Sequence, residues 1–140
     1  MAEVTTPVPA DPPDAGESAT PPTAPHLALG AWGEEMAARH LVARGMVLLS
    51  RNWRCEAGEI DLVLREGDVL VICEVKTRSS LSCGTPHEAV DARKVARLRR
   101  LAARWLAVHA ARPREVRIDL VAVVRPRRGE MHLEHVRGIG

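Results

Sequence analysis

The sequence contains no phenylalanine or tyrosine and only three tryptophans. Proteins that hold single-stranded nucleic acid without sequence preference stack its bases on aromatic side chains. With so few aromatic platforms, this mode of binding is disfavoured. Contacts from Arg and Lys to the backbone of duplex or branched nucleic acid stay open, and such binding would depend strongly on salt.

Cysteine and histidine provide no recognisable metal or redox centre. The three cysteines lie far apart, at positions 55, 73 and 83, without the close pairing of zinc sites and thiol redox motifs. The six histidines form no ligand cluster. Phosphate-binding loops of the Walker and GxGxxG types are also absent, so we expect no nucleotide cofactor.

Long apolar runs are missing from the chain, and basic residues are missing from its first part. Residues 1–29 contain no Lys or Arg and are rich in Pro, Ala and Thr. This composition predicts a disordered tail, because it cannot bury enough surface to offset the entropy of ordering. Neither a signal peptide nor a transmembrane segment is recognisable. We therefore expect a cytoplasmic protein with no membrane partner, whose single domain spans residues 30–140.

This domain is more basic than the whole chain. The tail holds four acidic residues, so residues 30–140 carry all 20 Lys and Arg side chains against 14 acidic ones. The formal charge of the domain is thus +6, compared with +2 for the chain. A basic domain of this kind fits a polyanionic partner such as nucleic acid.

Residues 59–66 and 69–76 are predicted to form an antiparallel hairpin. Gly67 and Asp68 form its turn, because glycine at the first central position suits a type II′ turn. Side chains alternate along each strand, so the register places one apolar face toward a core. The expected apolar pairs are Ile60 with Val75, Leu62 with Cys73, and Leu64 with Val71.

The other face of this hairpin concentrates charge. The register sets Asp61 opposite Glu74 and Glu59 opposite Lys76, and like charges directly opposed repel each other. Lys76 could compensate the two acids, or Mg²⁺ could be held by one or two of the carboxylates. A bound metal would polarise a phosphodiester and activate water, and Lys76 would orient that water or neutralise developing charge. The alternative is a surface hairpin with weak cross-strand ion pairs.

The order of Asp, a hairpin and Glu-x-Lys resembles the PD-(D/E)xK nuclease superfamily. Over about residues 30 to 125, several motifs in order resemble the uncharacterised bacterial YraN (UPF0102) family, which is more specific than one short pattern. These motifs are Gly33-Glu34-Glu35-Met36-Ala37-Ala38, Asn52-Trp53-Arg54, Gly58-Glu59-Ile60-Asp61-Leu62, Glu74-Val75-Lys76-Thr77-Arg78, Ala89-Val90-Asp91 and Lys94.

The resemblance implies the fold of restriction endonucleases and archaeal Holliday-junction resolvases. It marks Asp61 and Glu74 as carboxylates for Mg²⁺ or Mn²⁺ and Lys76 as the catalytic lysine. It marks Glu34, the acid of the first helix, as a third metal ligand or the partner of a metal-bound water. Glu35 is the competing candidate for this third acid. Considered by itself, Glu34 could simply stabilise the helix by interacting with the positive end of its dipole. Ile60 stands where the superfamily has proline, as is usual for this family. Resolvase-like relatives also suggest a homodimer.

Two helices, residues 32–45 and 87–111, are expected to flank the sheet. The second has an apolar stripe and many arginines, most of which we interpret as keeping the helix soluble. Arg78 and Lys94 are better candidates for phosphate contact. Residues 115–124 and about 131–136 are predicted strands. Asp119 in the first of them could add a further acid near the site, although an Asp in such a place more often pairs locally, here with Arg117.

The sequence thus predicts an α/β domain with a restriction-endonuclease-like core, in which helices flank a mixed sheet. The leading hypothesis is a metal-dependent endonuclease acting on DNA, including branched or repair intermediates. The alternative is a nuclease-fold protein that binds nucleic acid or a repair partner without cutting. A purely structural adaptor would use the charged face only for docking.

Overall fold

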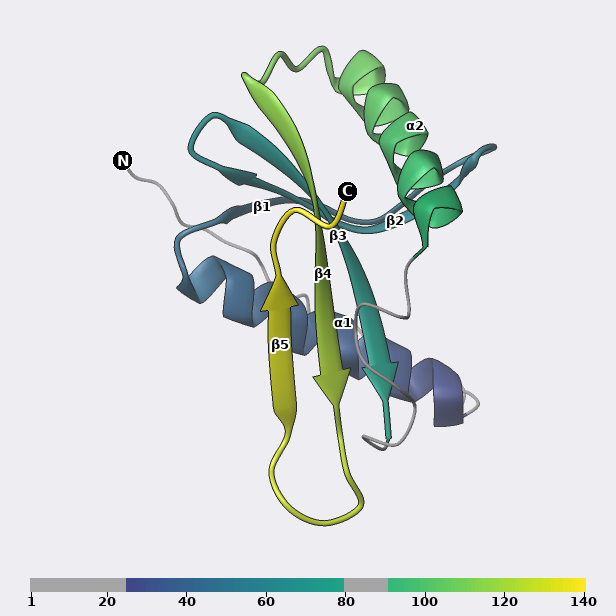
Figure 1. Ribbon diagram of the computed structural model, residues 1–140, viewed down its shortest axis with the longest axis vertical. Helices are drawn as coiled ribbons and strands as arrows, with labels where there is room; N and C mark the ends of the chain where they lie inside the picture. The colour runs from purple at the N-terminus through teal and green to yellow at the C-terminus, as the bar shows by residue number, and fades with distance from the viewer. Residues whose placement is uncertain (1–24, 80–90) are drawn as a thin grey trace, which may run out of the picture.

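The computed structural model describes residues 25–79 and 91–140. Within these ranges a five-stranded sheet is covered by two helices, α1 (Pro25–Ala43) and α2 (Ala92–His109) (Figure 1). Neither helix is apolar over enough residues to cross a membrane. Residues 1–24, which include most of the predicted tail, and the predicted loop at residues 83–86 lie outside the described residues.

The strands lie side by side in sequence order: β1 (Val47–Cys55), β2 (Gly58–Glu66), β3 (Val69–Arg78), β4 (Glu115–Val124) and β5 (His132–Val136). β3 and β4 are parallel, whereas the other neighbours are antiparallel. The connection between β3 and β4 contains α2, because parallel strands need a long crossover. The predicted α/β fold with a mixed sheet and flanking helices is confirmed.

Four of these strands correspond to predicted segments, and β1 was not predicted. The hairpin register is confirmed from Glu66–Val69 to Leu62–Cys73, and Gly67 has a φ of 60° at the turn. β1 lacks a clean alternation, because its register with β2 shifts between Leu48 and Ser50. Such a bulge interrupts the period-two pattern by which strands are recognised.

Both faces of the sheet are buried, which corrects the prediction of a single apolar face on the hairpin. One core lies between the sheet and α1 and includes Leu41, Leu62 and Val71. The other lies between the sheet and α2 and includes Ile60 and Ile72. Ile60 therefore packs on the side opposite to Leu62, because β2 turns toward α2 at this point (Figure 1).

α1 begins at Pro25, before the predicted start at residue 32, and ends at Ala43. Residues 25–29 thus belong to the helix, and proline is favoured at a first helical position. α1 approaches β3 closely at Gly33, where an added Cβ would lie 2.9 Å from the Cβ of Thr77. Only glycine permits this approach.

α2 is shorter than the predicted helix at residues 87–111. The Asp91 side chain accepts a hydrogen bond from the backbone N–H of Lys94 at 2.9 Å and caps the helix. Ala110 takes a left-handed conformation just past the helix, before Pro113. The predicted apolar stripe is confirmed over the described residues, since Leu98, Leu101, Ala102 and Trp105 are buried. Residues 87–90 lie outside the described residues.

Candidate active site

Charged side chains gather where β2 and β3 separate. Regular pairing between these strands ends at Leu62 and Cys73. Beyond that pair, the Asp61 carboxylate accepts a hydrogen bond from the backbone N–H of Val75 at 2.9 Å. The ladder therefore does not continue to place Asp61 directly opposite Glu74, as the simple register predicted. The Val75 N–H thus donates to the Asp61 side chain, whereas in a regular ladder it would donate to a backbone carbonyl.

The separation follows from the shape of the β1–β2 hairpin. Asn52 in β1 has a positive φ of 51°, and asparagine is among the few residues that tolerate this conformation. Past Asn52 the hairpin leans onto α2, where Trp53 and Ile60 pack in the core beneath the helix. Figure 1 shows β3 continuing away from this end of the hairpin. At this separation Asp61 is under the influence of the negative charges of Glu74, Glu34 and Glu59.

Asp61 experiences strong repulsion in this position. Burial and the negative charge of Glu74 raise the pKa of Asp61 to about 7, and Glu34 and Glu59 add to the effect. The hydrogen bond from Val75 opposes the shift but does not cancel it. The Asp61 carboxyl therefore titrates near neutral pH, well above the range of an ordinary aspartate.

Glu74 is nearly enclosed and is contacted by two lysines. Its Oε2 lies 2.6 Å from Lys94 Nζ and 3.5 Å from Lys76 Nζ. Burial and the neighbouring Lys94 lower the pKa of Lys76. Although burial opposes it, the ion pair with Glu74 raises the pKa of Lys94. α2 thus delivers to Glu74 a second lysine, which had been predicted only as a phosphate contact.

Of the two acids at the start of the first motif, Glu34 faces the cluster and Glu35 does not. Burial raises the pKa of Glu34, and the charges of Glu59 and Glu74 act in the same direction. Asn52 donates a side-chain hydrogen bond to Glu34. Glu35 is instead held by Arg39 at 2.7 Å and Arg51 at 2.9 Å. The geometry favours Glu34 over the competing assignment.

Glu59 has a different partner from the one expected. Its carboxylate lies 3.6 Å from Arg54 Nε, across the β1–β2 pair. The predicted opposition to Lys76 fails because β2 and β3 have separated before they reach these residues. Glu59 nevertheless contributes negative charge to the cluster, as its effect on Asp61 shows.

Asp61 and Glu74 together suit a hard divalent cation. Mg²⁺ is commonly held by one or two carboxylates, with water and substrate phosphate completing its coordination. Within the described residues, no three His, Cys, Asp or Glu side chains are grouped closely enough to hold a metal ion. Glu34 is therefore near the other two acids without forming a ready set of three ligands. The unrelieved repulsion at Asp61 is what a cation would remove.

Three other residues discussed from the sequence, Arg78, Asp119 and Cys73, lie in separate places. Arg78 is half-buried at the end of β3, and the described structure shows no carboxylate paired with it. Asp119 is fully buried and is engaged by Arg117 at 2.8 and 3.0 Å, which confirms the expected local pair. Cys73 is buried as predicted, and burial raises the pKa of its thiol. Neither Asp119 nor Cys73 belongs to the charged cluster.

Asn52 is the site residue that sequence reasoning missed. It appeared only as part of a motif, yet it bends the hairpin and contacts Glu34. The available signal was the residue type itself, because asparagine adopts positive φ more readily than other non-glycine residues. Its contact with a helix far away in the sequence could not be inferred without the fold.

The fold and the site together define the class of protein. It is an α/β domain with a mixed sheet, and its acids and lysines gather where the central strands β2 and β3 separate. The chain belongs to the uncharacterised protein family UPF0102, whose model matches residues 33–123. The match covers Gly33, the hairpin and α2, the elements that build the site.

Several curated relatives support this membership. A UPF0102 protein of Nocardioides sp. is 73% identical over 113 residues, covering 81% of this chain and 91% of the relative. The UPF0102 protein of Beutenbergia cavernae is 61% identical, covering 81% and 96%. That of Streptomyces coelicolor is 54% identical, covering 80% and 88%.

Proposed function

We propose that this protein is a metal-dependent endonuclease that hydrolyses phosphodiesters in DNA, with a fold of the PD-(D/E)xK superfamily. The observation that carries the proposal is the crowding of Asp61, Glu74 and Glu34 at the split between β2 and β3. Burial and mutual repulsion raise the pKa of Asp61 to about 7. A fold that only needed stability would avoid this arrangement, so perturbed acids of this kind mark functional sites.

Mg²⁺ or Mn²⁺ is the cofactor that this donor set fits. Asp61 and Glu74 would hold it, and Glu34 would act directly or through water. When bound, the ion supplies positive charge that polarises a phosphodiester and makes water a stronger nucleophile. Hydrolysis would join the hydroxyl of this water to phosphorus and break one P–O bond of the backbone, and the proton of the water would pass to the departing sugar oxygen.

Lys76 and Lys94 would have different roles in the reaction. Burial and Lys94 lower the pKa of Lys76, so its amine is suited to orient water or to neutralise charge on the reacting phosphate. Lys94 binds Glu74 at 2.6 Å and would have to release it, at least in part, when the carboxylate binds a cation. The freed ammonium would then lie beside the substrate phosphate.

The alternative is a nucleic-acid-binding protein that keeps the nuclease fold without cutting. The short Lys94–Glu74 ion pair favours this alternative, because it already neutralises one of the two metal carboxylates. A non-cleaving protein would keep this pair permanently, and the basic domain would bind DNA without divalent ions.

Cleavage with Mn²⁺ distinguishes the two functions. The protein is incubated with linear, nicked, flapped and four-way-junction DNAs, and the variants Asp61→Asn and Glu74→Gln are compared with wild type. Each variant is expected to lose cleavage by about 100-fold or more while retaining DNA affinity. Glu35→Gln is the matched control, because Glu35 is bound to two arginines outside the cluster.

The outcomes separate cleanly. Cleavage lost in Asp61→Asn and kept in Glu35→Gln supports the endonuclease, and the preferred DNA names its substrate class. Equal cleavage by wild type and Asp61→Asn would point to a contaminating nuclease and refute the assignment. Metal-independent binding without any cleavage would make the non-cutting protein the better description.

A further inference from the structure

One face of α2 carries a row of arginines that the proposed chemistry does not use. Arg93, Arg97 and Arg100, here called the arginine ridge, are all exposed. Their spacing of four and three residues places them on one side of a helix. The buried residues Leu98 and Trp105 hold α2 against the sheet, so the ridge faces away from the core.

The ridge is not balanced by acids. α2 contains no Asp or Glu in its 18 residues. Across residues 25–79 and 91–140, the ion pairs include none of the three ridge arginines. Arg104, one turn further along the helix, does pair with Glu56. A helix that needed arginine only for solubility would commonly intersperse carboxylates on this face.

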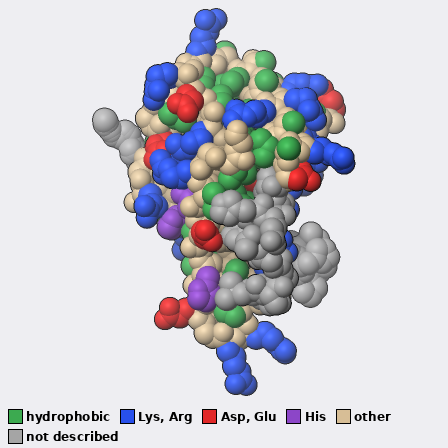
Figure 2. All heavy atoms as spheres, viewed as in Figure 1, with side chains coloured by type: hydrophobic (Ala, Val, Ile, Leu, Met, Phe, Trp, Pro, Cys, Tyr) green, Lys and Arg blue, Asp and Glu red, His purple; other side chains and the backbone are tan. Residues whose placement is uncertain are grey.

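The ridge begins beside the candidate active site. Lys94 lies one residue after Arg93 and contacts Glu74 at 2.6 Å. Arg97 follows Lys94 by three residues, about one turn along the same helix, so the two side chains are neighbours on its surface. Figure 2 shows Lys and Arg side chains over α2, in the upper right of the view. The positive charge is thus continuous from the acidic cluster along the helix.

We infer, building on the proposed function, that the arginine ridge binds the phosphate backbone of duplex DNA and guides it into the Asp61–Glu74 site. From Arg93 to Arg100 the helix rises about 10 Å, at 1.5 Å per residue. One strand of B-DNA carries a phosphate about every 3.4 Å along the axis, so the ridge spans about three phosphate-to-phosphate steps of one strand.

Duplex DNA fits this surface better than single strands. The tryptophan of α2, Trp105, is buried and donates its Nε1–H to Ser50 Oγ at 3.0 Å. The ridge therefore offers no aromatic ring on which an unpaired base could stack. Contacts from arginine to phosphate position a duplex without reading its sequence, which suits a protein whose specificity comes from DNA structure.

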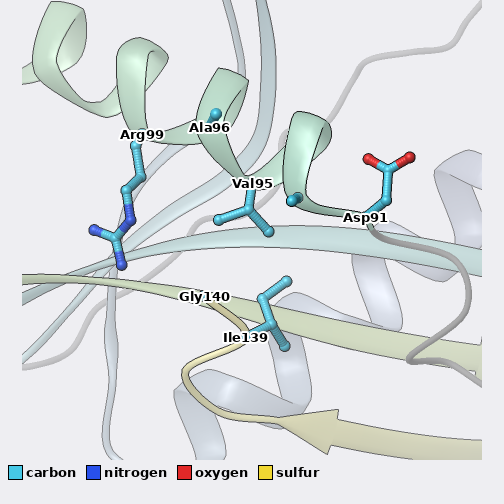
Figure 3. Close-up of a pocket in the computed structure, with 7 residues that line it drawn as sticks. Asp91, Val95, Ala96, Arg99, Ile139 and Gly140 are labelled. Atoms are coloured by element: carbon cyan, nitrogen blue, oxygen red, sulfur yellow. The ribbon is translucent and has the colours of Figure 1, made fainter.

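Three exposed arginines outside the ridge provide a matched control. Arg99 lies on a different side of α2 and borders a pocket between the helix and the last residues of the chain, with Val95 and Ile139 (Figure 3). Arg127 and Arg128 are exposed between β4 and β5. Replacing these three arginines changes the net charge by the same amount as replacing the ridge.

The test measures binding of the full chain to a fluorescent 20-base-pair duplex, in EDTA, across a series of salt concentrations. The ridge variant is Arg93→Gln, Arg97→Gln, Arg100→Gln, because glutamine keeps helix propensity. We expect it to bind on the order of 100-fold more weakly at 0.1 M salt, with a salt slope smaller by about 2.7. The control variant Arg99→Gln, Arg127→Gln, Arg128→Gln should stay within threefold of wild type.

Several results would overturn the assignment. Equal weakening in both triple variants would mean that net charge alone attracts DNA, and an unchanged ridge variant would exclude phosphate contact. If the ridge variant unfolds by circular dichroism, single Arg97→Gln takes its place, with an expected slope change of about 0.9. Preferential binding of wild type to anionic phospholipid vesicles over the duplex would assign the ridge to a membrane surface.

Binding in EDTA does not depend on cleavage, so the two proposals fail separately. If Asp61→Asn cuts as well as wild type but the ridge variant loses binding, the active site is wrong and the ridge stands. If Asp61→Asn loses cleavage but the ridge variant binds normally, the endonuclease stands and the ridge is refuted.

Discussion

Asp61 in β2 and Asp119 in β4 are two acids of one sheet in opposite electrostatic surroundings. Asp119 is completely buried, yet every side of its carboxylate has a partner. Although burial opposes it, hydrogen bonds from Arg117, the Gly138 N–H and His135 hold the pKa of Asp119 below its usual value. The distances are 2.8 and 3.0 Å to Arg117, 3.0 Å to Gly138 and 2.8 Å to His135 Nε2.

Asp61 is less buried but more perturbed. It has one backbone donor, Val75, and three acids around it, so its pKa rises to about 7. The contrast shows that burial by itself does not decide the state of an acid in this sheet. Asp119 receives hydrogen bonds from donors around it and stabilises the fold. Asp61 has fewer donors and more acidic neighbours, and under the proposed function a cation would compensate its charge.

The largest effect on stability is expected from removing Asp119, the acid whose carboxylate is fully hydrogen-bonded. Asp119→Ala leaves Arg117 without its bidentate partner in a mostly buried site, and it also frees the Gly138 N–H. We expect the free energy of unfolding to fall by about 3–5 kcal/mol, measured by urea denaturation. A loss below about 1 kcal/mol would show that the network is not structural.

The next change tests how α1 is held beside Asp61. Gly33→Ala forces a Cβ against the Thr77 side chain, so α1 must shift away from β3. We expect destabilisation by about 1–3 kcal/mol in chemical denaturation, with reduced cleavage because Glu34 moves with the helix. Gly30→Ala is the control: nothing lies within 4 Å of its added Cβ, so it should be neutral or slightly stabilising.

Asp61→Asn should stabilise the fold at high pH, in contrast to the two destabilising substitutions above. Because folding raises the pKa of Asp61, the wild type loses stability as pH rises from about 4 to 7. Asparagine does not ionise, so the variant should be more stable than wild type above pH 7 in EDTA. The full shift would correspond to about 4 kcal/mol. Because Asp61 is partly exposed to water, we expect a gain of about 1–2 kcal/mol. Urea denaturation at several pH values should show this gap closing below pH 4. A constant gap across the range would contradict the raised pKa.

The smallest expected effect lies at the rim of the Asp119 network. Arg137 contacts Glu66 at 2.7 Å but is half exposed, and Arg117 also binds Glu66, at 2.8 Å. Because exposed pairs contribute little and the second arginine remains, Arg137→Ala should cost only about 0.5 kcal/mol in urea denaturation. A loss as large as that of Asp119→Ala would extend the essential network to the surface.

Local patterns in the sequence were enough for much of the fold. β4 has the predicted bounds, the turn of the β2–β3 hairpin is at Gly67 and Asp68, and the buried stripe of α2 matches. Alternation and helical spacing are local properties, which explains this success. β1 was missed because a bulge and a positive φ at Asn52 disrupt its alternation.

For the candidate site, the sequence identified the residue types, and the prediction that Asp61, Glu74 and Lys76 share one region was sound in outline. The predicted register beyond Leu62 and Cys73 was wrong. It was extrapolated from two strands alone, whereas the position of β2 there also depends on its pairing with β1 and its packing against α2. The choice between Glu34 and Glu35 was likewise undecided until Arg39 and Arg51 were seen to hold Glu35.

The sequence by itself determined the hairpin, the apolar faces and the order of acids and lysines, since each depends on spacing along a few residues. Tertiary structure alone decided which charges meet. Lys94 reaches Glu74 because α2 packs across the sheet, and Asp119 gains His135 and Gly138 because β5 pairs with β4. Electrostatic energy depends on distance and burial, so the same acid side chain becomes a stabilising partner in one place and a candidate cation ligand in the other.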